Sequence, residues 1–353
     1  MDIEIIGLDS PLWLIALQKL RHDIYHLPAY VNLEAKRTKS TPEAIAISEN
    51  DKIFFLPYLW RSCADLFGDE LPEVFDVVSP YGYPGFLLSE AAANAPEFLN
   101  LALDTLTEVW RDRLVYSAFL RLHPLLNPEV KNKYIKVNGE TVSIDLKLKI
   151  AEILHDTRPE HRNKINRCKR AGFTATMVPF KQYINEFNLI YEQTMERVGA
   201  ARAYFFGEYY FKELAESLEN HLHLCIVELN DKIACSGLFS ECCGIVQYHL
   251  GGTNNEFLPL APSKLMFDYV RFWAKERGNE VFHLGGGVGG AKDSLYHFKA
   301  GFSKQRHTFL TLRLIPDEIK YRRLVELRAK YLHTEVETLL KTDFFPAYRA
   351  LNI

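Results

Sequence analysis

The chain has 353 residues, a hydrophobic content of 48% and a formal net charge of −3 at pH 7. This length suits two domains, and this composition is typical of a globular protein. The charge argues against a surface that binds nucleic acid over its whole extent, and no apolar run reaches the roughly 18 residues that span a bilayer. Because the first residues lack the basic flank and apolar core of a signal peptide, we expect a cytoplasmic location.

The first half of the chain mixes short strands and helices. Its apolar patterns predict, in chain order, a strand, a helix and two paired strands over residues 3–6, 12–20, 44–48 and 52–61. Pro57 has no amide hydrogen, so it should place the last of these strands at a sheet edge or a bulge.

An aromatic loop follows. Residues 76–86 interleave two prolines and two glycines with Tyr81 and Tyr83. A plain turn and a stiff loop whose rings frame a pocket are equally compatible with this composition. A helix and two strands should complete the first half, over residues 90–113, 115–122 and 141–146.

The second half opens with the most basic segment of the chain. Residues 158–170 place six cations, among them Arg162, on one predicted helix. Such a run is usually a solvated face; the alternative is an anion-binding patch, to which an anionic substrate would give a purpose. The pattern then predicts a strand, two helices, an antiparallel meander and a long helix over residues 173–178, 183–198, 209–219, 223–251 and 263–277.

The six cysteines show no pattern of a metal site or a disulfide. No CxxC pair occurs, and no cysteine–histidine spacing suits zinc, so we expect no metal. Cys225 and Cys235 lie in apolar, strand-like runs, where a thiol behaves as a small buried hydrophobe. Cys242 and Cys243 fall in a turn. We expect reduced, structural thiols.

The stretch from Val281 to Phe302 is the most distinctive. A short apolar strand runs into residues 285–290, of which five are glycine. Glycine adopts backbone angles closed to other residues, so such a loop can pass close to a ligand. Asp293 can cap the helix that follows. On that helix, an apolar stripe at helical spacing should face the core: Leu295, Phe298 and Phe302.

Lys299 lies near the end of this helix. It can complement the helix dipole and do nothing more, or it can supply a cation where negative charge develops during a reaction. A strand over residues 307–314 and a charged helical tail over 317–350 end the chain. These elements predict an α/β fold with mixed sheets.

Several segments of the second half resemble the FemABX-type transferases, which are tandem relatives of the GNAT acyltransferases. The resemblance covers most of residues 25–315 and is most specific from 245 to 303. It is carried by four segments: Tyr248–Thr253, the helix ending in Trp273–Gly278, the strand Val281–Leu284 with its glycines, and Asp293–Phe302. The basic helix ending at Gly172 and the first-half segments 79–85 and 121–124 are also similar to the family.

The resemblance implies two GNAT-like domains, the second inserted into the first. We expect them over residues 1–147 and 148–315, with a helical tail, 316–353, that returns to the first domain. In FemABX enzymes an amine on a peptidoglycan precursor attacks the ester carbonyl of an aminoacyl-tRNA, and an amide forms without a metal. The expected donor is therefore an aminoacyl-tRNA, the acceptor an anionic cell-wall or saccharide precursor, and no cofactor is required.

Within this resemblance Lys299 matches the family's oxyanion-stabilising lysine, and Phe298 is its adjacent aromatic residue. Tyr248 matches the strand tyrosine at the acceptor site. The other substrate-binding predictions come from looser matches or from the loop and charge patterns above: Arg202 with Tyr209, Lys36, Tyr81, Tyr83 and Arg162.

One departure from conventional GNAT sequences bears on the donor. In those proteins a glycine-rich loop holds the coenzyme A pyrophosphate with backbone amides. Residues 254–262 have two prolines, no glycine, and Glu256, which would repel an anion. Two alternatives stay open: a GNAT N-acetyltransferase that uses acetyl-CoA on an amino sugar or polysaccharide precursor, and a non-catalytic binding module on the same fold.

Overall fold

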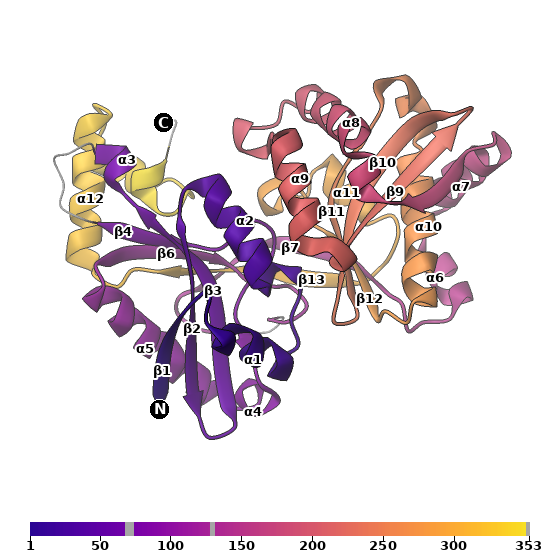
Figure 1. Ribbon diagram of the computed structural model, residues 1–353. Coiled ribbons are helices and arrows are strands. Elements are labelled where there is room, and N and C mark those ends of the chain that lie inside the picture. Colours follow the sequence, from indigo (N-terminus) through magenta and orange to yellow (C-terminus); the bar gives the residue numbers. More distant parts are fainter. Residues whose placement is uncertain (68–73, 128–130, 351–353) are drawn as a thin grey trace. The chain divides into compact units, whose positions relative to one another are not determined.

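The computed structural model describes residues 1–67, 74–127 and 131–350 (Figure 1). The chain forms two compact units: unit 1 comprises residues 1–138 and 309–353, and unit 2 comprises residues 139–308. The two boundaries between the units lie inside strands β7 (Ile135–Asp145) and β13 (Arg306–Leu314). The sequence placed them after residues 147 and 315, because a continuous strand gives no change of composition at its middle.

Unit 1 is built on a mixed sheet with the strand order β1-β2-β3-β4-β6-β13 and with β5 paired to β3. Helices α1 and α2 pack on one face and α5 on the other (Figure 1). The elements are β1 (Asp2–Gly7), α1 (Pro11–Lys19), η1 (Ile24–His26), α2 (Pro28–Thr38), β2 (Thr41–Glu49), β3 (Lys52–Ser62), α3 (Ala64–Phe67), β4 (Phe75–Val78), β5 (Leu87–Leu88), α4 (Glu90–Ala93), α5 (Pro96–Asp112) and β6 (Val115–Arg121).

Two prolines change the predicted elements of unit 1. Strand β3 pairs with β2 along its length, and on its other side with β5 at 54–55 and β4 at 59–62. Pro57 therefore does not mark a sheet edge; it lies between these two partners, where a strand tolerates a residue without an amide hydrogen. The helix expected over 90–113 is two helices, because Pro96 begins a new one.

The C-terminal segment packs within unit 1. Strand β13 pairs antiparallel with β6, and helices α12 (Glu318–Tyr331) and α13 (Val336–Leu340) bury Tyr321, Val325 and Leu339 in a cluster with Cys63. The expected single helical tail is thus divided, and His333, with a φ of 53°, lies between the two helices. The last three residues of the expected tail lie outside the described residues.

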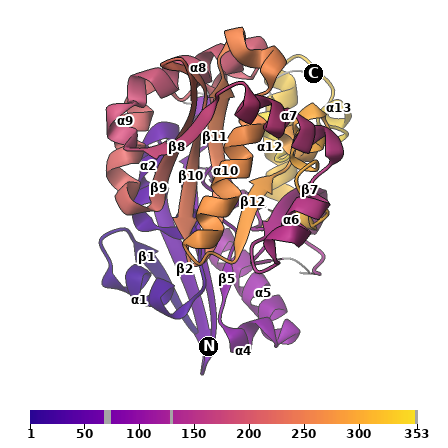
Figure 2. The ribbon, with the colours of Figure 1, turned by 90° about the vertical axis from the view of Figure 1, so that its right-hand side faces the viewer.

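Unit 2 contains a sheet with the order β7-β12-β11-β10-β9-β8. Strands β8 to β11 are antiparallel, which confirms the predicted meander, whereas β11 and β12 are parallel neighbours. Helices α7 and α10 pack on one face, and α8 and α9 on the other (Figures 1 and 2). The elements are α6 (Ile150–Asp156), α7 (Pro159–Arg170), β8 (Thr174–Val178), α8 (Ile184–Arg197), α9 (Gly207–Leu218), β9 (Leu222–Leu229), β10 (Lys232–Cys242), β11 (Ile245–Thr253), α10 (Ser263–Glu276), β12 (Val281–Gly285) and α11 (Ser294–Lys299).

Helix α10 is the connection that joins the two parallel strands. Its apolar side chains, among them Phe267 and Val270, are buried against the sheet, and burial of each such side chain contributes about 1.5–3 kcal/mol. Asp268 and Arg271 form a buried ion pair on the same helix. Lys169 also donates to Asp268 (2.8 Å), which ties α7 to α10.

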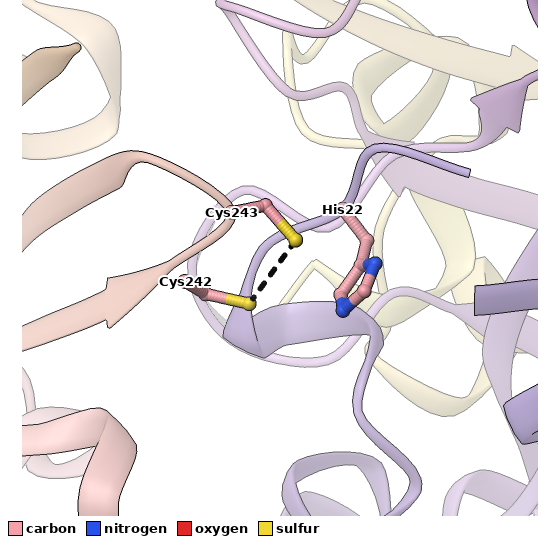
Figure 3. A group of neighbouring side chains, drawn as sticks. All are labelled: His22, Cys242 and Cys243. Carbon is pink, nitrogen blue, oxygen red and sulfur yellow. Dashed lines mark hydrogen bonds between the residues drawn. The ribbon is translucent and has the colours of Figure 1, made fainter. Parts of the chain in front are cut away.

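The cysteines are present as thiols, and Cys225 and Cys235 are fully buried. Burial raises the pKa of both thiols well above the usual value, which makes them poor nucleophiles. Cys242 and Cys243 lie at the β10–β11 turn with their Sγ atoms 3.9 Å apart (Figure 3), whereas a disulfide requires about 2.05 Å. Within the described ranges, no helix is long and apolar enough to cross a membrane.

Candidate active site

Lys299 is buried at the C-terminal end of α11, with 6% of its surface exposed. Its Nζ donates to the carbonyl oxygen of Gly286 (2.6 Å) and lies 5.6 Å from the centre of the Tyr248 ring. Among the described residues no carboxylate forms an ion pair with it. An ammonium held by a neutral carbonyl keeps most of its charge available to a bound group.

The environment of Lys299 lowers the pKa of its ammonium into the neutral range. Burial lowers the pKa of Lys299 to about 7, and the Asp293 carboxylate opposes this effect by raising the pKa. The ammonium and the neutral amine are therefore similarly populated near pH 7. A lysine with such a pKa is typical of functional sites, either as a cation or as a base.

The glycine loop brings the Gly286 carbonyl to Lys299. Gly285 has a φ of 79°, and a Cβ added to Gly286 would lie 2.7 Å from the backbone oxygen of Glu140. Asp293 closes the loop, because its carboxylate accepts from the amides of Tyr296 (2.8 Å) and Val288 (2.9 Å). Asp293 is thus the helix cap that the sequence predicts, and it also fixes the loop in front of the helix.

Helix α11 buries a different face from the one predicted. Tyr296 and Lys299 are buried, whereas Leu295 is 38% exposed and Phe298 is half-buried. Only Phe302 is fully buried as expected, and it lies beyond the end of the helix. The helix has six residues, so the 295-298-302 spacing does not define one stripe. A hydrogen bond from the Tyr296 hydroxyl to the Glu140 carboxylate accompanies the observed face.

An aromatic wall stands beside Lys299. The rings of Phe298 and Tyr248 pack on Phe267 of α10, with centroid distances of 5.2 and 4.8 Å. The structure thus brings together three residues that the sequence singled out: Lys299, Phe298 and Tyr248. Burial raises the pKa of Tyr248 above its usual value, so its phenol stays protonated and can donate a hydrogen bond.

The other predicted residues of unit 2 lie on other elements. Arg202 is exposed in the short helix η4 (Arg202–Tyr204). Tyr209 is 74% exposed on α9, and its hydroxyl donates to Glu213 (2.8 Å). Arg162 on α7 donates to the carbonyl oxygen of Leu154 (3.1 Å). No described contact joins Arg162 to Lys299, and the role of these three residues stays a prediction.

Lys36, Tyr81 and Tyr83 lie in unit 1. Lys36 is exposed on α2, and the buried Glu34 of the same helix accepts a hydrogen bond from the Tyr81 amide (3.2 Å). The Tyr83 ring packs edge-on against Tyr25, with 6.5 Å between ring centroids. These contacts fix the aromatic loop within unit 1, and the substrate-binding role of Lys36, Tyr81 and Tyr83 stays a prediction.

Two residues that sequence reasoning missed, His161 and Lys264, adjoin Phe298. Nε2 of His161 lies 2.9 Å from the Phe298 carbonyl oxygen. Nζ of Lys264 lies 3.3 and 3.1 Å from Nδ1 and Nε2 of the imidazole and 4.9 Å from the centre of the Phe298 ring. Burial lowers the pKa of His161 to about 4 and that of Lys264 to about 8.

One signal in the sequence could have found His161. Helix α7 buries His161, Ile165 and Cys168, which are spaced at one helical face, and it exposes most of its basic residues. A histidine on the apolar face of a strongly basic helix is therefore the residue that points inward. Lys264, at the N-terminal turn of α10, shows no comparable signal.

One family model matches most of unit 2. Residues 156–299 match the family model described as an acetyltransferase (GNAT) domain. The match lies within unit 2 and ends at Lys299. A search of curated proteins found no match.

The described fold is similar to solved structures over most of its length. The crystal structure of FemX aligns with a TM-score of 0.69 and 15% identity, and covers 92% of this chain and 99% of that one. The C-terminal domain of a putative lysylphosphatidylglycerol synthetase from Agrobacterium fabrum aligns with a TM-score of 0.53 and 12% identity, over 88% of this chain and 92% of that one. A conserved protein of unknown function from Bacteroides thetaiotaomicron VPI-5482 aligns with a TM-score of 0.51 and 12% identity, over 89% of this chain and 98% of that one.

These similarities confirm the predicted fold class, an α/β fold of GNAT type. The match of residues 156–299 to an acetyltransferase domain supports the predicted enzyme class, an acyltransferase.

Proposed function

We propose that this protein is a FemABX-type acyltransferase that forms an amide by moving an aminoacyl or acyl group from an activated ester or thioester to an amine. The observation that supports this most strongly is the buried Lys299, whose ammonium has no carboxylate partner among the described residues and lies at the end of the GNAT-matched segment. Attack on the carbonyl builds an oxyanion, and a fixed cation stabilises such a charge by a few kcal/mol.

The reaction assigns a role to each group at the site. The amine nitrogen bonds to the carbonyl carbon, the carbon–oxygen or carbon–sulfur bond breaks, and the proton that the amine loses passes to the leaving group or to water. Lys299 stabilises the oxyanion, and the Gly286 carbonyl holds its Nζ in place. Phe298, Tyr248 and Phe267 form a wall that keeps water from the charge. Holding the two reactants together supplies much of the remaining acceleration.

For the donor we propose an aminoacyl-tRNA, and for the acceptor an anionic cell-wall or saccharide precursor. The similarity to FemX over 92% of the chain favours this choice. Acetyl-CoA is the second candidate, with an amino sugar or polysaccharide precursor as acceptor. Two observations favour it: the matched family is described as an acetyltransferase domain, and Glu256, which should repel an anion, is paired with Lys232 (3.3 Å).

A transfer assay distinguishes the two donors. The protein is incubated with tRNA charged with a labelled amino acid and, separately, with labelled acetyl-CoA, each with a UDP-linked muramoyl peptide and with an amino sugar. We expect label to reach the peptide amine from the aminoacyl-tRNA, and calorimetric titration with acetyl-CoA to show no tight binding. Tight binding and transfer from acetyl-CoA would reverse the assignment of the donor.

The pH dependence should reveal the charge on Lys299. Because burial lowers its pKa to about 7, the ammonium is lost as the pH rises through that value, and kcat/KM should fall on the alkaline side. Lys299→Arg stays charged throughout, so its lower activity should show no alkaline decrease. Both are measured from pH 6 to 9 at constant ionic strength. An alkaline decrease that persists in Lys299→Arg would assign the titration to another group, such as Lys264.

A further inference from the structure

The turn that carries Lys299 is held by groups from α7. The backbone amide of Arg158 donates to the Gly301 carbonyl oxygen (2.8 Å), and Nε2 of His161 lies 2.9 Å from the Phe298 carbonyl oxygen. Because a carbonyl oxygen only accepts, Nε2 carries the hydrogen of this bond. The Phe298 carbonyl also accepts from the Gly301 amide (3.2 Å), so the bonds from α7 add a second support, from outside the turn, to the end of α11.

The His161 imidazole is itself confined. Its ring packs against Phe302 (4.8 Å between centroids) and Phe298 (5.8 Å), and 6% of the residue is exposed. With Nε2 as donor, Nδ1 is the ring nitrogen that can accept from Lys264, whose Nζ lies 3.3 Å from Nδ1 and 3.1 Å from Nε2. A Cβ added to Gly301 would overlap the imidazole, so this glycine leaves the space that the ring occupies.

The charge on the imidazole stays constant in the neutral range. Burial, the Lys264 ammonium on α10 and Arg158 on α7 together lower the pKa of His161 to about 4, although the bond to the Phe298 carbonyl and Glu160 act in the opposite direction. The ring is therefore neutral above about pH 5, and the direction of its bond to Phe298 does not change. The contact is a fixed support and not a switch.

We propose that His161 is a positioning residue, whose N–H holds the Phe298 carbonyl and thereby keeps Nζ of Lys299 against the Gly286 carbonyl. Phe298 and Lys299 are consecutive, so a peptide plane that turns at Phe298 moves the Lys299 backbone with it. A displacement of about 1 Å at a reacting group can lower a rate 10²-fold. The catalytic consequence rests on the proposed function; the positioning itself is tested without substrate.

The first test follows the protonation of Lys299 by NMR of protein labelled at lysine ¹³Cε, with the signal identified by its loss in Lys299→Arg. His161→Phe keeps a ring in the site and removes the N–H. We expect the titration midpoint of Lys299, about 7 in the parent protein, to rise by at least one pH unit, because a loosened turn admits water to the ammonium.

Two control variants test whether a change in the Lys299 midpoint is caused by the loss of the His161 N–H. His161→Gln restores an N–H donor and should return the midpoint toward that of the parent. His297→Gln, a change to an exposed histidine on the same helix, should leave it unchanged. A Lys299 midpoint that does not move in His161→Phe overturns the proposal. If that variant does not fold, Gly301→Ala displaces the imidazole from the other side, and the same midpoint is read.

The second test is kinetic. In the transfer assay, His161→Phe should lower kcat about tenfold with KM within twofold, and the double variant with Lys299→Met should be no slower than Lys299→Met alone. A loss that multiplies in the double variant would show that His161 acts by another route and would overturn the proposal. If Lys299→Met is fully active, the proposed role of Lys299 in transfer fails, and if the parent shows no transfer, the proposed function fails. In both cases the NMR midpoint still decides whether His161 positions the ammonium.

Discussion

Replacing Lys299 with methionine should lower the transfer rate by about 10²–10³-fold, the loss that follows removal of one oxyanion donor. Methionine keeps roughly the length of the apolar stem and removes the ammonium together with its contact to the Tyr248 ring. The fold should survive, because the substitution also removes the cost of a buried, unpaired charge. The measurement is single-turnover transfer, together with a thermal melt.

Lys304→Met is the matched control. Lys304 follows the same segment, its side chain is 68% exposed, and its ion pair with Asp156 is at the surface, so its loss should change neither the rate nor the fold appreciably. If folded Lys299→Met transfers as fast as the parent, Lys299 is not the oxyanion cation. The oxyanion would then have to be stabilised by another group of the site, whereas absence of transfer in the parent protein itself would favour the non-catalytic binding module.

Gly287→Ala should destabilise the protein by roughly 2–3 kcal/mol and lower activity as well. The added Cβ would overlap the carbonyl oxygen of Ala291 and a carboxylate oxygen of Asp293. Asp293 would have to move away, and the amides of Tyr296 and Val288 would lose their acceptor. The helix cap and the loop that aims the Gly286 carbonyl would fail together. Chemical denaturation and the transfer assay measure the two losses.

A substitution at a second glycine of the same loop distinguishes the cost of steric overlap from the cost of backbone strain. Gly289 has a φ of 62°, but a Cβ there would meet open space. Gly289→Ala should therefore cost only about 1 kcal/mol, the strain of a left-handed alanine. Equal losses in the two variants would mean that the contact between Gly287 and Asp293 has no special importance for this loop.

The parts of the fold with strong local patterns could be predicted from the sequence. The meander β9–β11 has three apolar runs joined by short turns, and it forms as expected. Helix α10 has one continuous apolar face, and Asp293 caps α11. In each case the residues that decide the structure are neighbours in the sequence, so a short window contains the information.

The predictions of secondary structure and burial were wrong where contacts outside the local sequence determine the structure. Leu295 is exposed because the buried face of α11 is set by contacts outside the helix, with Glu140, which is far away in sequence, and with the Gly286 carbonyl of the preceding loop. The prediction that Pro57 marks a sheet edge was wrong, because two short strands, β5 and β4, pair with the same side of β3 before and after this residue. The unit boundaries lie inside continuous strands.

The same difference applies to the candidate site. The resemblance pointed to Lys299, Phe298 and Tyr248, and the structure places these three together. The apolar face of α7 could have marked His161 as a buried residue, but its partner could be found only in three dimensions, since the bond to the Phe298 carbonyl spans 137 residues. The roles of Arg202 and Lys36 stay predictions, because they lie on exposed elements whose local sequence matches the family loosely.

The division of the chain has a consequence for its biosynthesis. Unit 2 is one uninterrupted segment, whereas unit 1 needs residues 309–353 to complete its sheet and the cluster around Tyr321. On the ribosome the earlier strands of unit 1 must therefore wait, with the edge of β6 and the surface around Cys63 uncovered, until the whole of unit 2 has been made. The order of synthesis thus favours unit 2 as the first part to reach its native packing, and nascent chains halted before residue 309 should be the ones that chaperones retain.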